Sequence, residues 1–442
     1  MSAVIRHGLA LALSFLAGIS LTAVHTVWAE KEISPENKLP LDELRTFTGV
    51  LDAIKEDYVE PVKDRDLLEN AIRGMLSNLD PHSAFLDAEA FQDLQIGTSG
   101  EFGGLGIEVG QENGFLKVIA PIDDTPAQRA GIRAGDLIIR LDDVSVKGMS
   151  LSDAIQRMRG KPNTAITLTI VRESMRKPLK IKLIREVIQV KSVKSRLLEP
   201  GFGYLRITQF QAKTAQNLRQ AMQEIEQQNK GPLRGLVMDL RNNPGGVLNG
   251  AVDVADDFLE EGAIVQTKGR GNGSDQSFKA TPGDLLKGAP LVVLVNGGSA
   301  SASEIVAGAL QDHHRALILG ERTFGKGSVQ TILPLGNGTA VKLTTARYYT
   351  PNGRSIQAEG IEPDIKLKPF KVATSAEGAD SDTVKEADLT GHLRNDGKVP
   401  ADGAPDARIT GAEGDPTQSD YPLYEALNLL KGMTLLQTRK NG

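Results

Sequence analysis

Apolar residues recur with different periods along this chain, and the changes of period divide it into regions. Between residues 41 and 96 they recur at helical spacing, as at Leu41, Leu44 and Phe47. Asp80-Pro81-His82 closes the second helical run, because proline disfavours helical backbone in the residue before it. The pattern predicts a helical region over residues 30–98.

Residues 99–187 carry short apolar runs separated by glycine, which indicates a compact and mostly β module. The stretch Gly103-Gly104-Leu105-Gly106 precedes its first strand, and Ser150 and Asp153 are spaced as the start of a helix. Strands of this module are predicted at 107–110, 115–120, 136–141, 165–171 and 179–183.

Residues 188–370 alternate between strand and helix patterns, which predicts a largely parallel sheet covered by helices. The run 290–296 is almost wholly apolar, as expected for a strand buried on both faces. Strands are predicted at 202–210, 235–240, 290–296 and 316–319, and helices at 215–227, 247–259 and 301–311.

The C-terminal region divides into a polar stretch and an amphipathic helix. Residues 371–418 are rich in Gly, Ala, Asp and Pro, so a flexible linker is expected there. Residues 419–442 contain a predicted helix at 422–436 with a leucine stripe that includes Leu423 and Leu430. Such a stripe must be buried, either by self-association or by docking on the chain's own core.

The first 29 residues have the pattern of an export signal. A short polar stretch at Arg6 and His7 precedes a mostly apolar run, and Val27-Trp28-Ala29 offers a cleavage site. The alternative is an uncleaved membrane anchor, although the run is short for a span. Either way, the remainder of the chain is expected to be exported.

Composition removes several classes of function. A net charge of −5 without basic runs gives no support for nucleic-acid binding. The chain has no cysteine, which excludes disulfides and a thiolate nucleophile, and its 6 histidines lack metal-binding spacing. No metal and no cofactor are therefore expected.

A candidate nucleophile lies where the strand 290–296 runs through Gly297 and Gly298 into a helix. This junction exposes Ser301 at the carboxyl edge of the sheet, and free backbone N–H groups there suit a developing oxyanion. The alternative is that Ser301 only caps the helix, since Ser301 and Glu304 have capping-box spacing.

A serine nucleophile needs a base, and helix geometry disfavours the nearby histidines. His313 lies roughly 18 Å along the helix from Ser301. The return strand instead brings Lys326, between two glycines, to the same sheet edge, with Gln330 on the same face of an extended segment. Burial lowers the pKa of a lysine enough for it to act as a base. The alternative is an exposed surface lysine.

A second strand ends at the same edge in Asn242-Asn243-Pro244-Gly245-Gly246. A backbone N–H of Gly245 or Gly246 beside that of Ala302 would form an oxyanion hole. The alternative is an ordinary Asn-Pro-Gly turn.

Five segments, in order over about residues 40–370, resemble the carboxyl-terminal processing, or tail-specific, proteases. The segments are Asp80-Pro81-His82-Ser83, Phe102-Gly103-Gly104-Leu105-Gly106-Ile107, Asp239-Leu240-Arg241-Asn242-Asn243-Pro244-Gly245-Gly246, Gly298-Ser299-Ala300-Ser301-Ala302-Ser303-Glu304 and Thr323-Phe324-Gly325-Lys326-Gly327-Ser328-Val329-Gln330.

The resemblance implies a serine endopeptidase with a Ser–Lys dyad and an acyl-enzyme intermediate. It selects Ser301 among Ser299, Ser301 and Ser303, which the residues alone leave open. It implies Lys326 as general base, Gln330 as its orienting residue, and Ala302 with Gly245 or Gly246 as oxyanion donors.

The resemblance also implies a crotonase-like α/β core with an inserted PDZ domain at 99–187. Leu105, Gly106 and Ile107 would then bind a free chain terminus, whose peptide adds as a strand. Arg159 occupies the position of an arginine proposed in the family to couple the PDZ domain to the active site.

The resemblance also implies partners and a location that no residue here specifies. The partners are protein substrates, among them cell-wall hydrolases, a lipoprotein adaptor and further copies of the chain in a homo-oligomer. The location is the periplasm, with membrane association if the leader is retained. Two other readings stay open: a non-catalytic PDZ scaffold or chaperone, and a Ser–His–Asp esterase that uses Asp312 and His313.

Overall fold

The computed structural model describes residues 40–112, 114–173, 175, 177–271, 273–367, 385–393 and 420–441. The chain divides after Ile72 into two compact units, and each is described by itself. Within those described ranges, no helix is both long and apolar enough to cross a membrane. The predicted export signal at 1–29 and most of the predicted linker fall outside them.

The helical pattern of the N-terminal region is confirmed. It forms α2 (Leu41–Asp57), α3 (Asp64–Ser77) and, after the short strand β1 (Ala84–Leu86), α4 (Ala88–Ser99). α3 ends before Asp80-Pro81-His82, as the proline predicts. Asp87 caps α4 through Ala90 N, and Gly100 at φ +73° ends it.

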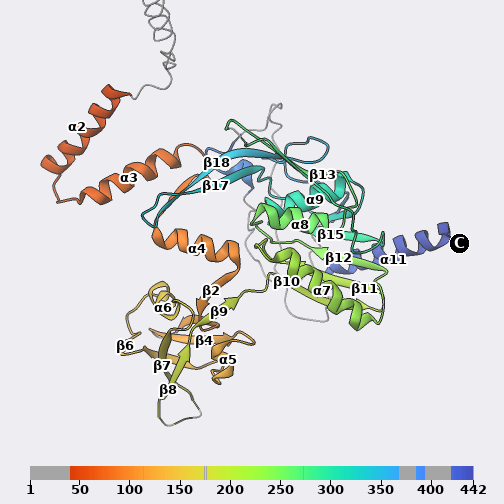
Figure 1. Cartoon of the computed structure of the whole chain (residues 1–442), viewed down its shortest axis with the longest axis horizontal. Coiled ribbons are helices and arrows are strands. Elements are labelled where there is room, and N and C mark those ends of the chain that lie inside the picture. Colours follow the sequence, from red (N-terminus) through yellow and green to blue (C-terminus); the bar gives the residue numbers. More distant parts are fainter. Residues whose placement is uncertain are drawn as a thin grey trace, which may run out of the picture. The chain divides into compact units, whose positions relative to one another are not determined.

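The module predicted at 99–187 contains a six-stranded antiparallel sheet around its own apolar core (Figure 1). Two further strands, β2 and β9, pair with each other where the chain enters and leaves the module. The elements are β2 (Glu101–Gly104), β3 (Ile107–Glu112), β4 (Phe115–Pro121), α5 (Pro126–Arg129), β5 (Leu137–Leu141), β6 (Val144–Ser145), α6 (Leu151–Met158), β7 (Ala165–Val171), β8 (Leu179–Ile184) and β9 (Glu186–Gln189).

The alternating region contains the predicted parallel sheet. Its strand order is β10-β11-β12-β15-β16-β19, in which neighbours from β11 to β19 are parallel and β10 is antiparallel to β11. The strands are β10 (Val193–Glu199), β11 (Phe202–Ile207), β12 (Gly235–Asp239), β15 (Leu291–Val295), β16 (Leu317–Gly320) and β19 (Ile365–Lys366).

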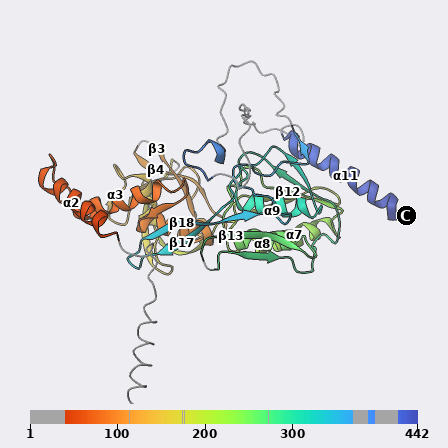
Figure 2. The ribbon, with the colours of Figure 1, turned by 90° about the horizontal axis from the view of Figure 1, so that it is seen from above.

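Both faces of this sheet are covered by helices (Figure 2). Alternate strand residues serve the two sides: Met238 packs in the cluster with α7, α8 and α9, whereas Val237 packs in the cluster with α11. This two-sided burial explains the continuous apolar run of β15. The helices are α7 (Thr214–Asn229), α8 (Leu248–Asp256), α9 (Ala302–Asp312) and α11 (Tyr421–Asn441).

A second, antiparallel sheet lies in the same region and was not predicted. Its central strand β18 pairs with β1, β13 and β17, and β14 pairs with β13. The β13–β14 and β17–β18 pairs are hairpins, whereas the pairings of β18 with β1 and β13 join segments far apart in sequence, which a local pattern does not predict. The strands are β13 (Ala263–Gly269), β14 (Gln276–Lys279), β17 (Ser328–Pro334) and β18 (Ala340–Tyr349).

The leucine stripe of the C-terminal helix docks on the chain's own sheet. Leu423, Leu427 and Leu430 are buried in the cluster that includes Val237 and Val292. The described structure therefore favours docking over self-association for this stripe. The sheet has an apolar face on that side, and α11 shields it from water.

The predicted linker contains one described segment, 385–393, and it is packed. Glu386 begins the short 3-10 helix η2 (Glu386–Asp388), and its side chain is fully buried. The composition of residues 371–418 predicted a flexible linker here. A single buried side chain hardly changes the composition of a segment, so composition could not reveal that Glu386 is packed.

Candidate active site

β15 ends in a turn that presents Ser301 at the carboxyl edge of the parallel sheet. α9 begins at the next residue, so Ser301 occupies the N-cap position. Its backbone has φ +54° and ψ −111°, a conformation that costs energy for a residue with a side chain. Such strained residues cluster at functional sites. An ordinary helix cap has no need of this conformation.

The three serines of this turn have different surroundings. The hydroxyls of Ser299 and Ser303 donate to backbone carbonyls of Leu240 and Asn243, at 2.8 and 3.0 Å, and both side chains are fully buried. They tie the turn to the end of β12. Ser301 keeps 8% of its surface exposed. All three serines are buried, but Ser301 alone retains some exposed surface, and Ser299 and Ser303 have structural hydrogen bonds.

Tyr348 on β18 is a neighbour of Ser301 that sequence reasoning missed. Its hydroxyl hydrogen-bonds with the Ser301 side chain, and burial raises the pKa of Tyr348 to about 12. The phenol therefore stays neutral at ordinary working pH. Only the fold of the antiparallel sheet brings β18 to this point, so no local signal could have found the contact.

Glu304 connects the Ser301 turn to the Lys326 loop. Its carboxylate accepts hydrogen bonds from the backbone nitrogens of Ser301 (2.7 Å), Gly325 (2.7 Å) and Lys326 (2.9 Å), and from Thr323 Oγ1 (2.5 Å). One oxygen, Oε2, serves both Ser301 and Lys326, so their backbones are adjacent. The capping-box spacing was the available sequence signal, but it predicted only the bond to Ser301.

The Glu304 carboxyl is fully buried, and burial raises its pKa to about 7 against the opposing effect of its four donors. Such a group is costly to bury unless each oxygen is satisfied. A buried acid that joins the two halves of a site therefore serves to position them.

Lys326 is partly buried, and this burial lowers the pKa of its ammonium group. Lys342 lowers the pKa further, whereas the carboxylates of Glu386, Glu304 and Asp80 act in the opposite direction. The net lowering raises the fraction of neutral lysine, the form that accepts a proton. The structure thus places Lys326 as expected, at the same sheet edge as Ser301.

Gly245 lies directly against the Ser301 turn. A Cβ built on Gly245 would meet Ala300 O at 2.8 Å and Ser301 Cβ at 2.9 Å, and its φ is +101°. Only glycine fits this approach. Its N–H donates to Asn243 Oδ1 at 2.9 Å. Ala302 opens α9, so its N–H has no partner within the helix.

A buried ion-pair network supports the end of β12. Asp239 accepts from Tyr204 at 2.7 Å and from both Arg206 and Arg241, and these cations hold the pKa of its carboxyl below its usual range despite burial. Arg241 also reaches Asp420, at the start of α11. The network fixes the strand end from which the glycine turn departs.

Gln330 lies in β17, two residues after Ser328. Its amide donates to Ser328 Oγ at 2.9 Å and to Thr344 Oγ1 at 3.3 Å, and positions two apart on a strand share a face. The irregularity of this ladder is an extra residue on β18, because Val329 pairs with Ala346 and Gln330 with Thr344. The described hydrogen bonds of Gln330 do not include Lys326, so its role toward the lysine stays a prediction.

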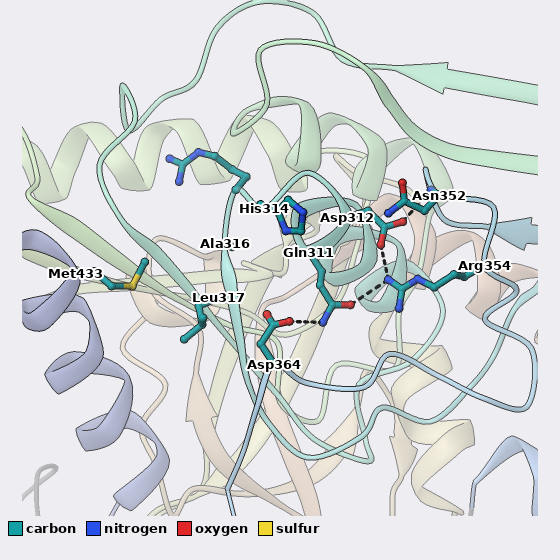
Figure 3. A pocket seen from close by; sticks show the side chains of 10 residues that line it. Gln311, Asp312, His314, Ala316, Leu317, Asn352, Arg354, Asp364 and Met433 are labelled. Atoms are coloured by element: carbon teal, nitrogen blue, oxygen red, sulfur yellow. Dashed lines mark hydrogen bonds and ion pairs between the residues drawn. The ribbon is translucent and has the colours of Figure 1, made fainter. Parts of the chain in front are cut away.

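The Ser–His–Asp alternative is excluded by geometry. Asp312 and His313 lie at the far end of α9 from Ser301. Asp312 accepts from Asn352 N and Arg354, beside the pocket shown in Figure 3. His313 Nε2 contacts Ala263 O at 2.7 Å. These residues have structural partners there and cannot reach the serine.

The 99–187 module has an apolar groove where a peptide was expected. Leu105, Gly106 and Ile107 line a cavity of 250 Å³, together with Ile155 and Met158 of α6. The groove thus lies between β3 and α6, as the addition of a peptide strand to β3 requires.

Arg159 lies at one end of this groove and faces α4. Its guanidinium pairs with Asp93 at 2.5 Å and lies over the Phe102 ring at 5.4 Å. The described side-chain contacts of Arg159 are therefore with Asp93 of α4 and Phe102 of β2, and none of them involves Ser301.

Three family descriptions match separate parts of the chain. Residues 201–367 match peptidase family S41, residues 117–172 match the PDZ domain, and residues 14–90 match the N-terminal domain of the activating protease CtpB. The peptidase match contains both Ser301 and Lys326.

Individual proteins agree with these matches. A carboxy-terminal-processing protease of Bartonella bacilliformis is 48% identical over 95% of this chain and 95% of its own length. A carboxyl-terminal-processing protease of Synechocystis is 40% identical over 70% of this chain and 74% of its own. The solved photosystem II D1 C-terminal processing protease is 34% identical, covers 73% of this chain and 87% of its own, and has a TM-score of 0.43. The chain is a member of the carboxyl-terminal processing protease family, a peptidase of family S41 with a PDZ domain.

Proposed function

We propose that the protein is a serine endopeptidase in which Ser301 is the nucleophile and Lys326 the general base. The observation that carries this proposal is the Glu304 carboxylate, which binds the backbone of both residues. The strained backbone of Ser301, its residual exposure and the lowered pKa of Lys326 support the same assignment.

In the proposed reaction, neutral Lys326 takes the proton of Ser301 Oγ while that oxygen bonds to the carbonyl carbon of the scissile peptide. The carbonyl oxygen becomes an oxyanion. Its collapse breaks the C–N bond, and Lys326 returns the proton to the leaving amine, so that an acyl ester remains on Ser301. Water then attacks the ester with the same two proton transfers and releases the new C-terminus.

The oxyanion donors in this proposal are the N–H of Ala302 and one glycine N–H. The glycine is Gly245 or Gly246: Gly245 lies against Ser301 and Ala302 but its N–H donates to Asn243 Oδ1, whereas Gly246 lies against the backbone of Phe210. Gln330 would orient Lys326 by hydrogen bonding, with its amide held by Ser328 of β17 and Thr344 of β18. We also propose that the protease core has a crotonase-like fold.

We propose that substrates are exported proteins recognised through their C-termini by the groove at Leu105–Ile107. The free carboxylate would meet backbone N–H groups of the loop while the peptide pairs with β3. On peptide binding, Arg159 would give up its ion pair with Asp93, and this change would couple the PDZ domain to the active site. The proposal also includes four expectations taken from the family. They are a periplasmic location, cell-wall hydrolases as substrates, a lipoprotein adaptor and a homo-oligomer.

The proposal is tested with Ser301→Ala, Lys326→Ala and the double variant. All three are expected to lose peptide cleavage to a similar extent, because dyad residues act as a unit. A fluorophosphonate probe should add one label to the wild type, located at Ser301 by peptide mass, and His313→Ala should remain active. Substantial activity in Lys326→Ala contradicts the dyad.

The alternative is a non-catalytic PDZ scaffold. The same experiment distinguishes it, since a scaffold would bind peptides without cleavage and without labelling of Ser301. Unfolding midpoints of the variants show whether any loss arises from misfolding.

A further inference from the structure

Beyond the peptidase match, a short segment of the chain returns to Lys326. The match ends at residue 367, and the segment 385–393 lies past it. Glu386 in this segment has 0% of its surface exposed. A buried carboxylate is costly unless hydrogen bonds and opposite charges compensate, so its partners indicate its role.

Two side chains hold the Glu386 carboxylate. His82 Nε2 lies 2.8 and 2.7 Å from its two oxygens, and Gln357 Nε2 donates to Oε1 at 2.9 Å. His82 belongs to the Asp80–Ser83 motif, whose function the sequence did not explain. Glu386 thus joins this motif to the loop that follows β18.

The same group restrains the chain on both sides of Lys326. Glu386 N–H donates to Phe324 O at 3.3 Å, before the lysine. Gln357, which holds the Glu386 carboxylate through its amide nitrogen, accepts from Gly327 N with its Oε1 at 3.0 Å, after the lysine. A substitution at Glu386 would therefore keep the backbone contact with Phe324 and remove the carboxylate that holds Gln357 against Gly327.

The charge of Glu386 also acts on Lys326. Burial raises the pKa of Glu386, but hydrogen bonds from His82 and Gln357 and the charges of His82 and Lys326 bring it below its usual value. Glu386 is therefore ionised in the working range. Four charged groups influence Lys326: Lys342 lowers its pKa, whereas Glu386, Glu304 and Asp80 raise it.

We infer that Glu386 is a positioning residue for Lys326, and that the segment that contains it packs beside the lysine loop instead of forming part of a linker. The inference rests on the proposed Ser–Lys dyad. Glu386 sets the geometry of the lysine loop through Phe324 and Gln357, and its charge sets the pH at which the lysine becomes neutral.

The test uses the full chain with Glu386→Gln and Glu386→Ala, and Asp388→Asn as the matched control. Asp388 is an exposed carboxylate in the same turn, and its variant removes an equal charge. Its carboxylate accepts from Lys385 N, a bond that the oxygen of an Asn side chain can keep. The measurements are kcat/KM against pH and the pH dependence of fluorophosphonate labelling at Ser301.

Glu386→Gln should move the acidic limb of both profiles to lower pH, because a negative charge that favours the charged lysine is gone. Glu386→Ala should in addition reduce the plateau kcat about tenfold to a hundredfold through misplacement of the base. Asp388→Asn should match the wild type. Unchanged profiles in both Glu386 variants, or an equal shift in the control, overturn the inference.

Failure of the inference differs from failure of the proposed function. If the wild type neither cleaves peptide nor reacts with the probe, the dyad proposal has failed. If the wild type is active and the Glu386 variants match it, only the role of Glu386 is refuted. If Glu386→Ala does not fold, the pH profile of Glu386→Gln decides.

Discussion

The guanidinium of Arg241 and the carboxylate of Asp420 form two hydrogen bonds of 2.7 Å, although 179 positions separate them in the chain. Arg241 leads into the turn that contains Gly245, and Asp420 precedes α11. The C-terminal helix is thus tied to the proposed oxyanion side of the active site.

Asp420→Ala should lower both stability and catalysis. It leaves the buried Arg241 with Asp239 alone, and loss of hydrogen bonds to a charged group costs about 1.5–3 kcal/mol. Thermal unfolding and kcat would be measured together, with Glu425→Gln as a charge-matched control in the same helix. A stability loss without any change in kcat would limit α11 to a structural role.

Glu304→Gln should abolish most activity, because an amide cannot accept four hydrogen bonds and its NH2 group opposes the backbone donors. A misplaced nucleophile and base cost about a hundredfold in kcat. Peptide cleavage by correctly folded protein is the measurement. Activity near the wild-type level would show that Glu304 does not hold the dyad together.

The same variant has a signature in stability. Burial raises the pKa of Glu304 from 4.5 to about 7, so the folded state holds a proton that the unfolded state releases. This contribution is fully present below pH 4.5 and is lost as pH rises through about 7. The wild type should therefore lose unfolding free energy, relative to Glu304→Gln, across this window. Parallel curves for the two proteins would contradict the raised pKa.

Lys342→Gln should move the acidic limb of kcat/KM to higher pH. Lys342 lowers the pKa of Lys326 by charge repulsion, so its removal makes the base harder to deprotonate. The rate would be measured from about pH 5 to 10, on both sides of the plateau. The direction is opposite to that expected for Glu386→Gln, and a shift of both variants in one direction would disprove the electrostatic account.

Peptide binding by the full-length Ser301→Ala protein should depend on a free C-terminus. Amidation removes the carboxylate that the loop at Gly106 is proposed to bind, so the affinity should fall. Ile155→Arg, which places charge in the groove, should weaken both peptides. Equal affinity for free and amidated peptides would show that the groove reads another feature.

Local sequence patterns predicted much of the secondary structure and the edge at which the site lies. Apolar periodicity predicted β12, β15 and α9, because an element buried on one or both faces carries apolar residues at regular spacing in its own short sequence. The motif segments, through their resemblance to a family, predicted which residues belong to the site. These inferences needed only short stretches of chain.

Contacts across long separations were decided by the tertiary structure alone. Packing against the end of β12 buried Ser299 and Ser303 completely and left Ser301 with 8% of its surface exposed. The antiparallel sheet brought Tyr348 to the serine and Thr344 to Gln330.

The sequence by itself determined the helices and the strands of the parallel sheet and of the 99–187 module and, through the resemblance, the family and the two residues of the proposed dyad. Only the tertiary structure brought Glu304, Glu386 and Asp420 to that dyad and to its supporting strand. The physical reason is that a buried carboxylate is recognisable only through the donors that compensate it, and here those donors come from distant segments. No periodicity or composition encodes such partners.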